Sequence, residues 1–207
     1  MSESKPLSLY KYLPHHLDRI GGVFVRRKAR FTNPVKFNDP FDCMQRIRFP
    51  DPDNVSAADE SLLREYVDHI HKDGGGLVTT TGQQITPKIA FANGLHKNKQ
   101  FIESMPEAIH KYTQQEARRI GVFCLSERPI SVSMWAHYAS NHRGLVVEFD
   151  HSKLCNDEGE IHSFAVNYSS ELPTLADYMK AVNSKDATEF WQLFFCRKSN
   201  EWQAEEE

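Results

Sequence analysis

The sequence contains few cysteines, and they are widely spaced. The four are Cys43, Cys124, Cys155 and Cys196. They form no Cys-x-x-Cys pair and no Cys/His pattern typical of a zinc site. We therefore expect free thiols in a reducing compartment, most of them serving as small core residues.

Long apolar runs are also absent. No stretch approaches the roughly 20 consecutive apolar residues that a transmembrane helix needs. The first nine residues include two charges, Glu3 and Lys5, and no apolar segment, so they do not resemble a signal peptide. Together these absences predict a cytoplasmic protein with no membrane partner.

The sequence has no excess of positive charge. Its 25 Lys and Arg residues are outnumbered by 28 Asp and Glu residues. A protein that clamps long nucleic acids regardless of sequence normally needs a strong basic excess, so this class is disfavoured. One basic cluster, Arg26-Arg27-Lys28-Ala29-Arg30, has two interpretations: it contacts a phosphate-bearing ligand, or it is a solvated strand edge whose charges resist aggregation.

What is present is typical of a globular chain. Apolar residues make up 40% of the sequence and charged residues 26%, which argues against disorder. A length of 207 residues suits one domain, residues 1–207, around one hydrophobic core.

Hydrophobic periodicity and turn residues predict the elements. We expect strands at 8–13, 23–31, 122–125, 145–149 and 164–168, with a last strand beginning at 201. We expect a helical turn at 16–20 ended by Gly21-Gly22, and helices at 56–72, 101–118, 131–140, 174–182 and 184–198. This order predicts an α+β fold with small mixed or antiparallel sheets and a helical insert near 50–118. Repeated βαβ units and a Gly-x-Gly-x-x-Gly motif are missing, so a doubly wound parallel sheet is disfavoured.

Three segments are candidates for chemistry. The first is Phe37-Asn38-Asp39-Pro40-Phe41-Asp42, a turn fixed by proline. Asn38 and Asp39 either contact a polar ligand, or cap nearby backbone while the two phenylalanines anchor the turn in the core. Both interpretations remain open.

The second segment joins the end of a strand, Ser126, to an aromatic helix. Trp135 and Tyr138 are three residues apart, so both can face one site. Polar groups just past a strand end commonly line pockets, and aromatic rings there can stack on a nicotinamide or adenine ring. Alternatively, Trp135 and Tyr138 are ordinary core anchors.

The third segment is acidic. If a strand begins at Glu201, then Glu205 and Glu207 share one face and Glu206 the other. Such a carboxylate pair can bind a ribose diol or stabilise a cationic transition state. The alternative is a solvated acidic segment. The histidine pairs lack a third ligand at useful spacing, so we predict no metal site.

Several motifs together resemble a large bacterial and phage family known only as a domain of unknown function. They are Leu-Tyr-Lys-Tyr at 9–12, Phe-Asn-Asp-Pro-Phe-Asp at 37–42, Phe-Cys-Leu-Ser at 123–126, Met-Trp-Ala-His-Tyr-Ala at 134–139, and Lys198 before Glu201-Trp202-x-x-Glu205-x-Glu207. Because that family continues past this last motif, the resemblance implies a C-terminally truncated chain.

The family's layout is in turn similar to the ADP-ribosyltransferase fold, with an aromatic first strand, a middle strand ending in Ser, an aromatic helix and a late Glu-x-Glu. This similarity implies that NAD is the substrate. It assigns Glu207 as the catalytic carboxylate and Glu205 as its partner. The NAD-binding residues would be Tyr10, Tyr12, Asn38, Asp39, Ser126, Trp135 and Tyr138.

Three hypotheses follow. The leading one is an ADP-ribosyltransferase-like enzyme of bacterial or phage conflict that modifies a protein or nucleic-acid target. The second is a non-enzymatic module that binds a nucleotide or a partner through Asn38, Asp39, Arg26 and Trp135. The third is an RNA-directed enzyme that uses His137 and the basic strand.

Overall fold

The computed structural model describes residues 8–37, 42–43, 46–72, 77–78, 83–154 and 161–207. The chain divides into two compact units. The first comprises residues 1–43, 117–170 and 196–207, and the second comprises residues 44–116 and 171–195. Helices and short paired strands are both present, which confirms the predicted α+β class.

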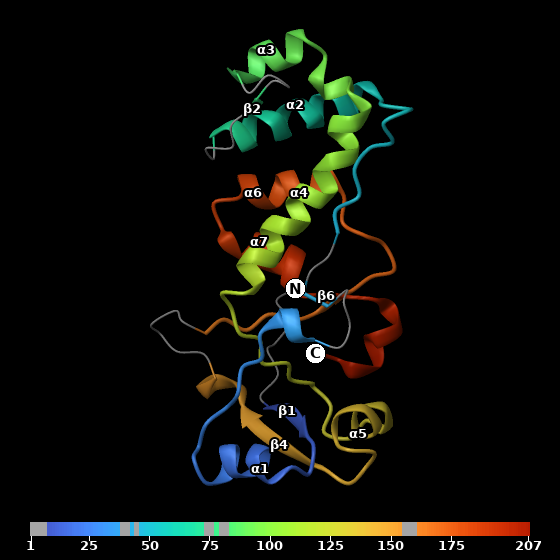
Figure 1. Cartoon of the computed structure of the whole chain (residues 1–207). Helices are drawn as coiled ribbons and strands as arrows, with labels where there is room; N and C mark the ends of the chain where they lie inside the picture. Colours follow the sequence, from blue (N-terminus) through green and yellow to red (C-terminus); the bar gives the residue numbers. More distant parts are fainter. Residues whose placement is uncertain (1–7, 38–41, 44–45, 73–76, 79–82, 155–160) are drawn as a thin grey trace. The chain divides into compact units, whose positions relative to one another are not determined.

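The first unit is built around two antiparallel strands, β1 (Ser8–Leu13) and β4 (Leu145–Asp150), paired from Ser8↔Asp150 to Leu13↔Leu145 (Figure 1). The predicted bounds of β1 are confirmed, since Pro14 cannot continue the ladder. The strand expected at 122–125 is not continuous. Within it only Val122 bridges, to Thr32, and the following residue Ser126 bridges Tyr10 of β1.

Helix α5 (Val132–Tyr138) lies beside this strand pair (Figure 1). The Ser131 hydroxyl accepts a hydrogen bond from the Met134 amide and caps the helix. After α5 the chain returns to β4 through Gly144. A Cβ at this glycine would collide with the Leu13 carbonyl oxygen and come within 2.8 Å of Ala139 Cα, so only glycine allows this close approach.

Two predictions for residues 16–31 are wrong: the helical turn does not end at Gly21-Gly22, and no strand follows it. Helix α1 (Leu17–Phe24) runs through Gly21-Gly22, and the Lys28 amide then donates back to the Gly22 carbonyl. The chain therefore folds over the helix where a strand at 23–31 was expected. Two short 3-10 turns, η1 (Pro34–Lys36) and η3 (His151–Lys153), complete this part.

The C-terminal segment also differs from the prediction. The helix expected at 184–198 ends earlier, and Arg197–Lys198 instead form β6, parallel to β5 (Asn167–Tyr168). A 3-10 helix, η4 (Asn200–Glu205), replaces the expected last strand. The Ser199 hydroxyl accepts from the Glu201 amide and starts this turn, which sequence alternation alone does not reveal.

The second unit is mainly helical and includes the predicted helical insert. Its helices are α2 (Ala57–Lys72), α3 (Pro87–Ala92), η2 (Leu95–Lys97), α4 (Lys99–Ala117), α6 (Leu175–Asn183) and α7 (Ala187–Phe195), with a short hairpin of β2 (Leu77–Val78) and β3 (Gln84–Ile85). Capping boxes at Ser56/Asp59 and Thr174/Asp177 begin α2 and α6, which explains why both helices start within a residue of the predicted positions 56 and 174. The core is formed by residues such as Leu63, Val67, Ile102, Leu175 and Phe194.

Candidate functional site

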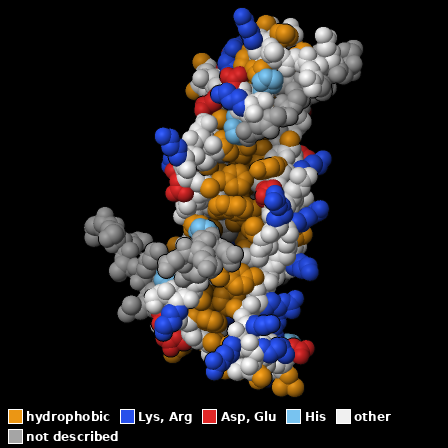
Figure 2. Space-filling view, turned by 90° about the vertical axis from the view of Figure 1, so that its left-hand side faces the viewer, with side chains coloured by type: hydrophobic (Ala, Val, Ile, Leu, Met, Phe, Trp, Pro, Cys, Tyr) orange, Lys and Arg blue, Asp and Glu red, His pale blue; other side chains and the backbone are white. Residues whose placement is uncertain are grey.

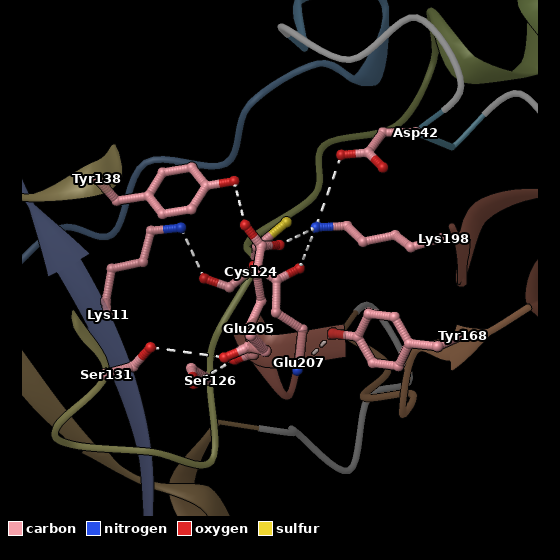
Figure 3. A network of polar contacts seen from close by, with 11 residues as sticks. Lys11, Asp42, Cys124, Ser126, Ser131, Tyr138, Tyr168, Lys198, Glu205 and Glu207 are labelled. Atoms are coloured by element: carbon pink, nitrogen blue, oxygen red, sulfur yellow. Dashed lines mark hydrogen bonds and ion pairs between the residues drawn. The ribbon is translucent and has the colours of Figure 1, made fainter. Parts of the chain in front are cut away.

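A buried lysine lies at the centre of the candidate site, within the first unit (Figure 3). Lys198 Nζ is 2.7 Å from Glu205 Oε2, 2.8 Å from Glu207 Oε2 and 3.6 Å from Asp42 Oδ2. The side chains of Lys198, Glu205 and Glu207 are only 7%, 3% and 6% exposed. One ammonium group thus gathers three carboxylates from two distant parts of the sequence.

The local backbone explains why both glutamates point to the lysine. Glu206 has φ 46°, in the left-handed region, so the chain turns sharply between Glu205 and Glu207. Glu206 points elsewhere and forms an ion pair with Arg128. Both carboxylates therefore reach Lys198, but a turn brings them together and not the strand on which the predicted shared face depended.

Hydrogen bonds hold this acidic segment against the rest of the unit. The Ser126 hydroxyl donates to the Glu205 carbonyl oxygen at 2.5 Å, and the Glu127 amide donates to the Glu206 carbonyl at 2.7 Å. On the other side, the Val166 amide donates to the Glu207 carbonyl at 2.9 Å. The Ser126 side chain is fully buried, so its hydroxyl positions the acidic segment.

Two tyrosines complete the network. Tyr138 donates its phenol hydrogen to Glu205 Oε1 at 2.6 Å, and the Tyr168 hydroxyl accepts from the Glu207 amide at 2.9 Å (Figure 3). Burial, followed by the hydrogen bond to Glu205, raises the pKa of Tyr138 well above its usual range. Burial raises the pKa of Tyr168 to about 12. Tyr138 therefore remains a proton-bearing donor throughout the neutral range.

Lys198 keeps its charge for a different reason. Burial alone would lower its pKa, but the charge of Glu207 and the hydrogen bonds to Glu205 and Glu207 outweigh burial and raise it. The formal charges of one ammonium and three carboxylates sum to −2 when all four are ionised. The cluster therefore presents a surplus of negative charge.

This cluster faces a cavity of about 320 Å³. The residues that line it include Tyr10, Tyr12, Asp42, Tyr138, Lys198 and Glu207. A larger cavity of about 1010 Å³ shares five lining residues with it, Lys11, Tyr12, Arg19, Thr32 and Tyr138. The two therefore adjoin, and the structure brings four of the predicted site residues, Tyr10, Tyr12, Tyr138 and Glu207, to one hollow.

Other predicted site residues lie differently. The Trp135 ring packs edge-on against Tyr12, with centroids 5.8 Å apart, beside the core formed by Tyr12, Met134 and Ala139. Trp135 and Ser126 are not among the residues that line either cavity. Asn38 and Asp39 lie outside the described residues.

The described residues were also searched for metal-ligand groups and for a reactive thiol. In the part of the chain that the structure describes, His, Cys, Asp and Glu side chains form no group able to hold a metal ion. Cys124 lines the smaller cavity, but burial raises the pKa of its thiol to about 12, so it is a weak nucleophile. Among the described residues, no helix is both long and apolar enough to cross a membrane.

Lys198, Lys11 and Tyr168 were not among the predicted site residues. Lys198 stands three residues before Glu201 and Lys11 lies in the Leu-Tyr-Lys-Tyr run, and their place in the family motifs was the available signal. Lys11 Nζ donates to the Cys124 carbonyl at 2.6 Å and lies 5.1 Å from the Phe123 ring centroid. Such a contact, across more than a hundred residues, has no signature in a single sequence.

A family model matches the C-terminal part of the chain. Residues 134–207 match the model of a family described as "Protein of unknown function (DUF2971)". This match confirms the predicted resemblance to a family of unknown function over the region that contains Tyr138, Lys198, Glu205 and Glu207. Searches of the curated proteins and of the solved structures each found no match.

Proposed function

We propose that this protein binds NAD and transfers its ADP-ribose group, using Glu207 at the smaller cavity. The observation that supports this most strongly is the convergence of three tyrosines and Glu207 on one hollow beside a cluster with surplus negative charge. Cavities that bind small molecules typically measure about 300–1,000 Å³. The two adjoining cavities, at about 320 and 1010 Å³, lie at the two ends of this range.

The residues that line the smaller cavity suit the pyrophosphate and the ring systems of NAD. Lys11, Arg19 and Lys36 supply positive charge for a pyrophosphate, and Tyr10, Tyr12 and Tyr138 supply aromatic faces. The nicotinamide ring of NAD is cationic. It would lie nearest the cluster of three carboxylates around Lys198, whose negative surplus favours a cation even when the Glu207 charge is removed.

The proposed reaction breaks the bond between ribose C1′ and the nicotinamide nitrogen. The bonding electron pair leaves with nicotinamide, which becomes neutral, and positive charge develops on the ribose. The Glu207 carboxylate stabilises this charge and can accept a ribose hydroxyl hydrogen bond. A lone pair on the acceptor's oxygen or nitrogen then forms the new bond to C1′, and the acceptor's proton passes to water.

Nicotinamide release from NAD, followed by chromatography, tests the proposal. Release by the wild-type chain should fall at least a hundredfold in Glu207→Gln, which keeps the size of the side chain and removes its charge. Glu206→Gln is the matched control, because Glu206 pairs with Arg128 away from Lys198, and it should stay within twofold. Absence of release by the wild-type protein, or equal release by Glu207→Gln, would sink the proposal.

A second candidate is a nucleotide-binding module without catalysis. It is favoured by one observation, the ion pair between Lys198 and a Glu207 side chain that is only 6% exposed, because such a pair can serve purely to hold the fold. This candidate predicts saturable NAD binding with no nicotinamide release, and equal binding by Glu205→Gln, Glu207→Gln and wild type.

A further inference from the structure

The charged side chains that line the larger cavity are mostly basic. Five basic side chains line it, and the one carboxylate among its lining residues is that of Asp18. The basic residues are Lys11, Arg19, Arg26, Lys28 and Arg30. Among the described residues, no ion pair neutralises any of these five. The cavity therefore attracts anions.

The segment after α1 aims alternate basic residues at this cavity. Arg26, Lys28 and Arg30 line it, whereas Arg27 between them does not. All three are exposed, so their charges are available to a ligand. Figure 2 shows Lys and Arg side chains flanking apolar surface at the lower end of the molecule, where Figure 1 places α1, β1 and β4.

Aromatic rings lie among these charges. Phe31 lines the cavity, is 43% exposed, and packs on Phe123 with ring centroids 5.4 Å apart. Exposed rings between basic side chains are the arrangement that binds single-stranded nucleic acid, because each base can stack while its phosphate meets a cation. An acidic peptide would use the charges but would leave the Phe31 ring without a partner.

We infer that the larger cavity binds a short single-stranded nucleic-acid segment. Its role as the acceptor of ADP-ribose rests on the proposed function, but the binding itself does not. The acidic net charge of the whole chain argued against a long clamp, and a cavity of about 1010 Å³ accommodates only a few nucleotides. The shared wall of Lys11, Tyr12 and Tyr138 would place such a segment next to Glu207.

Fluorescence anisotropy of a labelled eight-nucleotide single strand, without NAD, tests the inference. We expect saturable binding that weakens with salt. The double variant Lys28→Gln/Arg30→Gln should bind at least tenfold more weakly, and its log–log salt slope should shrink by about 1.4, since each lost phosphate contact accounts for about 0.7. The double variant Arg27→Gln/Arg118→Gln removes the same charge outside the cavity and should change affinity less than threefold.

Phe31→Leu separates stacking from charge. It keeps an apolar side chain, so affinity should fall roughly five- to hundredfold per lost stacked base while the salt slope stays unchanged. Three results would overturn the inference: no saturable binding by the wild-type chain, equal losses in both double variants, or displacement of the strand by poly-glutamate as readily as by unlabelled oligonucleotide. The anisotropy assay contains no NAD, so failure here and failure of NAD turnover are distinguishable.

Discussion

Lys198 Nζ lies 2.8 Å from Glu207 Oε2, and these two residues stand nine positions apart in the sequence. Their ion pair fixes the C-terminal segment to β6 and turns the Glu207 carboxylate toward the smaller cavity. Removing the lysine would leave three carboxylates together without their cation. The same ion pair therefore holds the C-terminal segment in place and orients the Glu207 carboxylate at the cavity.

Lys198→Met should be strongly destabilising. Breaking a buried pair by removing one partner typically costs about 3–5 kcal/mol, because uncompensated charge stays buried. Lys153→Met is the matched control, since its pair with Asp150 lies at the surface and exposed pairs contribute about 1 kcal/mol or less. Denaturant unfolding of the wild type, Lys198→Met and Lys153→Met measures the two changes in unfolding free energy. Equal stabilities of the two variants would contradict the central position of Lys198.

Stability should fall in alkaline solution. The pKa values of Lys198, Tyr138 and Tyr168 are all raised in the folded protein, from ordinary values of 10.5 for lysine and 10.0 for tyrosine. A raised folded pKa adds stability that is complete below the unfolded pKa and is lost as pH rises through the folded value. We expect the unfolding free energy to begin falling near pH 9, where the Cys43, Cys124 and Cys196 thiols of the unfolded chain ionise, and to fall further above pH 10.

Carbon-13 NMR of labelled tyrosine rings identifies the groups responsible. The Tyr138 and Tyr168 resonances should keep their phenol shifts at pH 10.5, where an unperturbed tyrosine is mostly ionised. If both rings titrate near pH 10 in a protein that stays folded, the described network does not protect them.

Gly144 permits the close approach of the chain before β4 to β1 and α5. Gly144→Ala should lower the unfolding free energy by about 1–3 kcal/mol, because the new methyl group meets backbone atoms that cannot move independently. Gly21→Ala is the control: no atom lies within 4 Å of its added Cβ, and alanine favours a helix by about 0.5–1 kcal/mol. Thermal unfolding should show shifts of opposite sign, and a neutral Gly144→Ala would refute the packing described.

Cys43, Cys124 and Cys196 should react slowly with alkylating reagents. Burial raises the pKa of Cys124 and Cys196 to about 12 and raises that of Cys43 as well. Since only the thiolate reacts, iodoacetamide at pH 8 should leave these three unmodified in the native protein and label them after denaturation. Peptide mass spectrometry measures each site. Rapid native labelling of Cys124 would show that its thiol is activated.

Local signals in the sequence predicted some elements well. The alternating aromatic run before Pro14 gave the bounds of β1, and the Ser56/Asp59 capping box gave the start of α2, because both signals lie within a few neighbouring residues. The acidic segment shows the limit of such signals. Alternation predicted a strand, but the Ser199 cap and the long-range contacts of Glu205 and Glu207 with Lys198 favour a 3-10 turn.

The candidate site residues were also predicted well where a local signal marked them and poorly where only tertiary contacts place them. Tyr138 and Glu207 were selected because a helix and a short acidic motif marked them, and the structure brings both to one cavity. Trp135 lies on the same helix, yet its ring packs edge-on against Tyr12 of β1, a contact between distant parts of the sequence that helical spacing alone does not predict. Asp42 joins Lys198 only through tertiary folding, which no local pattern encodes.

Calorimetric titration of NAD into the wild-type chain and into Glu207→Gln tests the central claim most directly. If the smaller cavity is the NAD site and Glu207 acts mainly on the transition state, both proteins should bind NAD with dissociation constants within about threefold of each other. Absence of saturable heat with the wild-type protein at millimolar NAD would contradict the account.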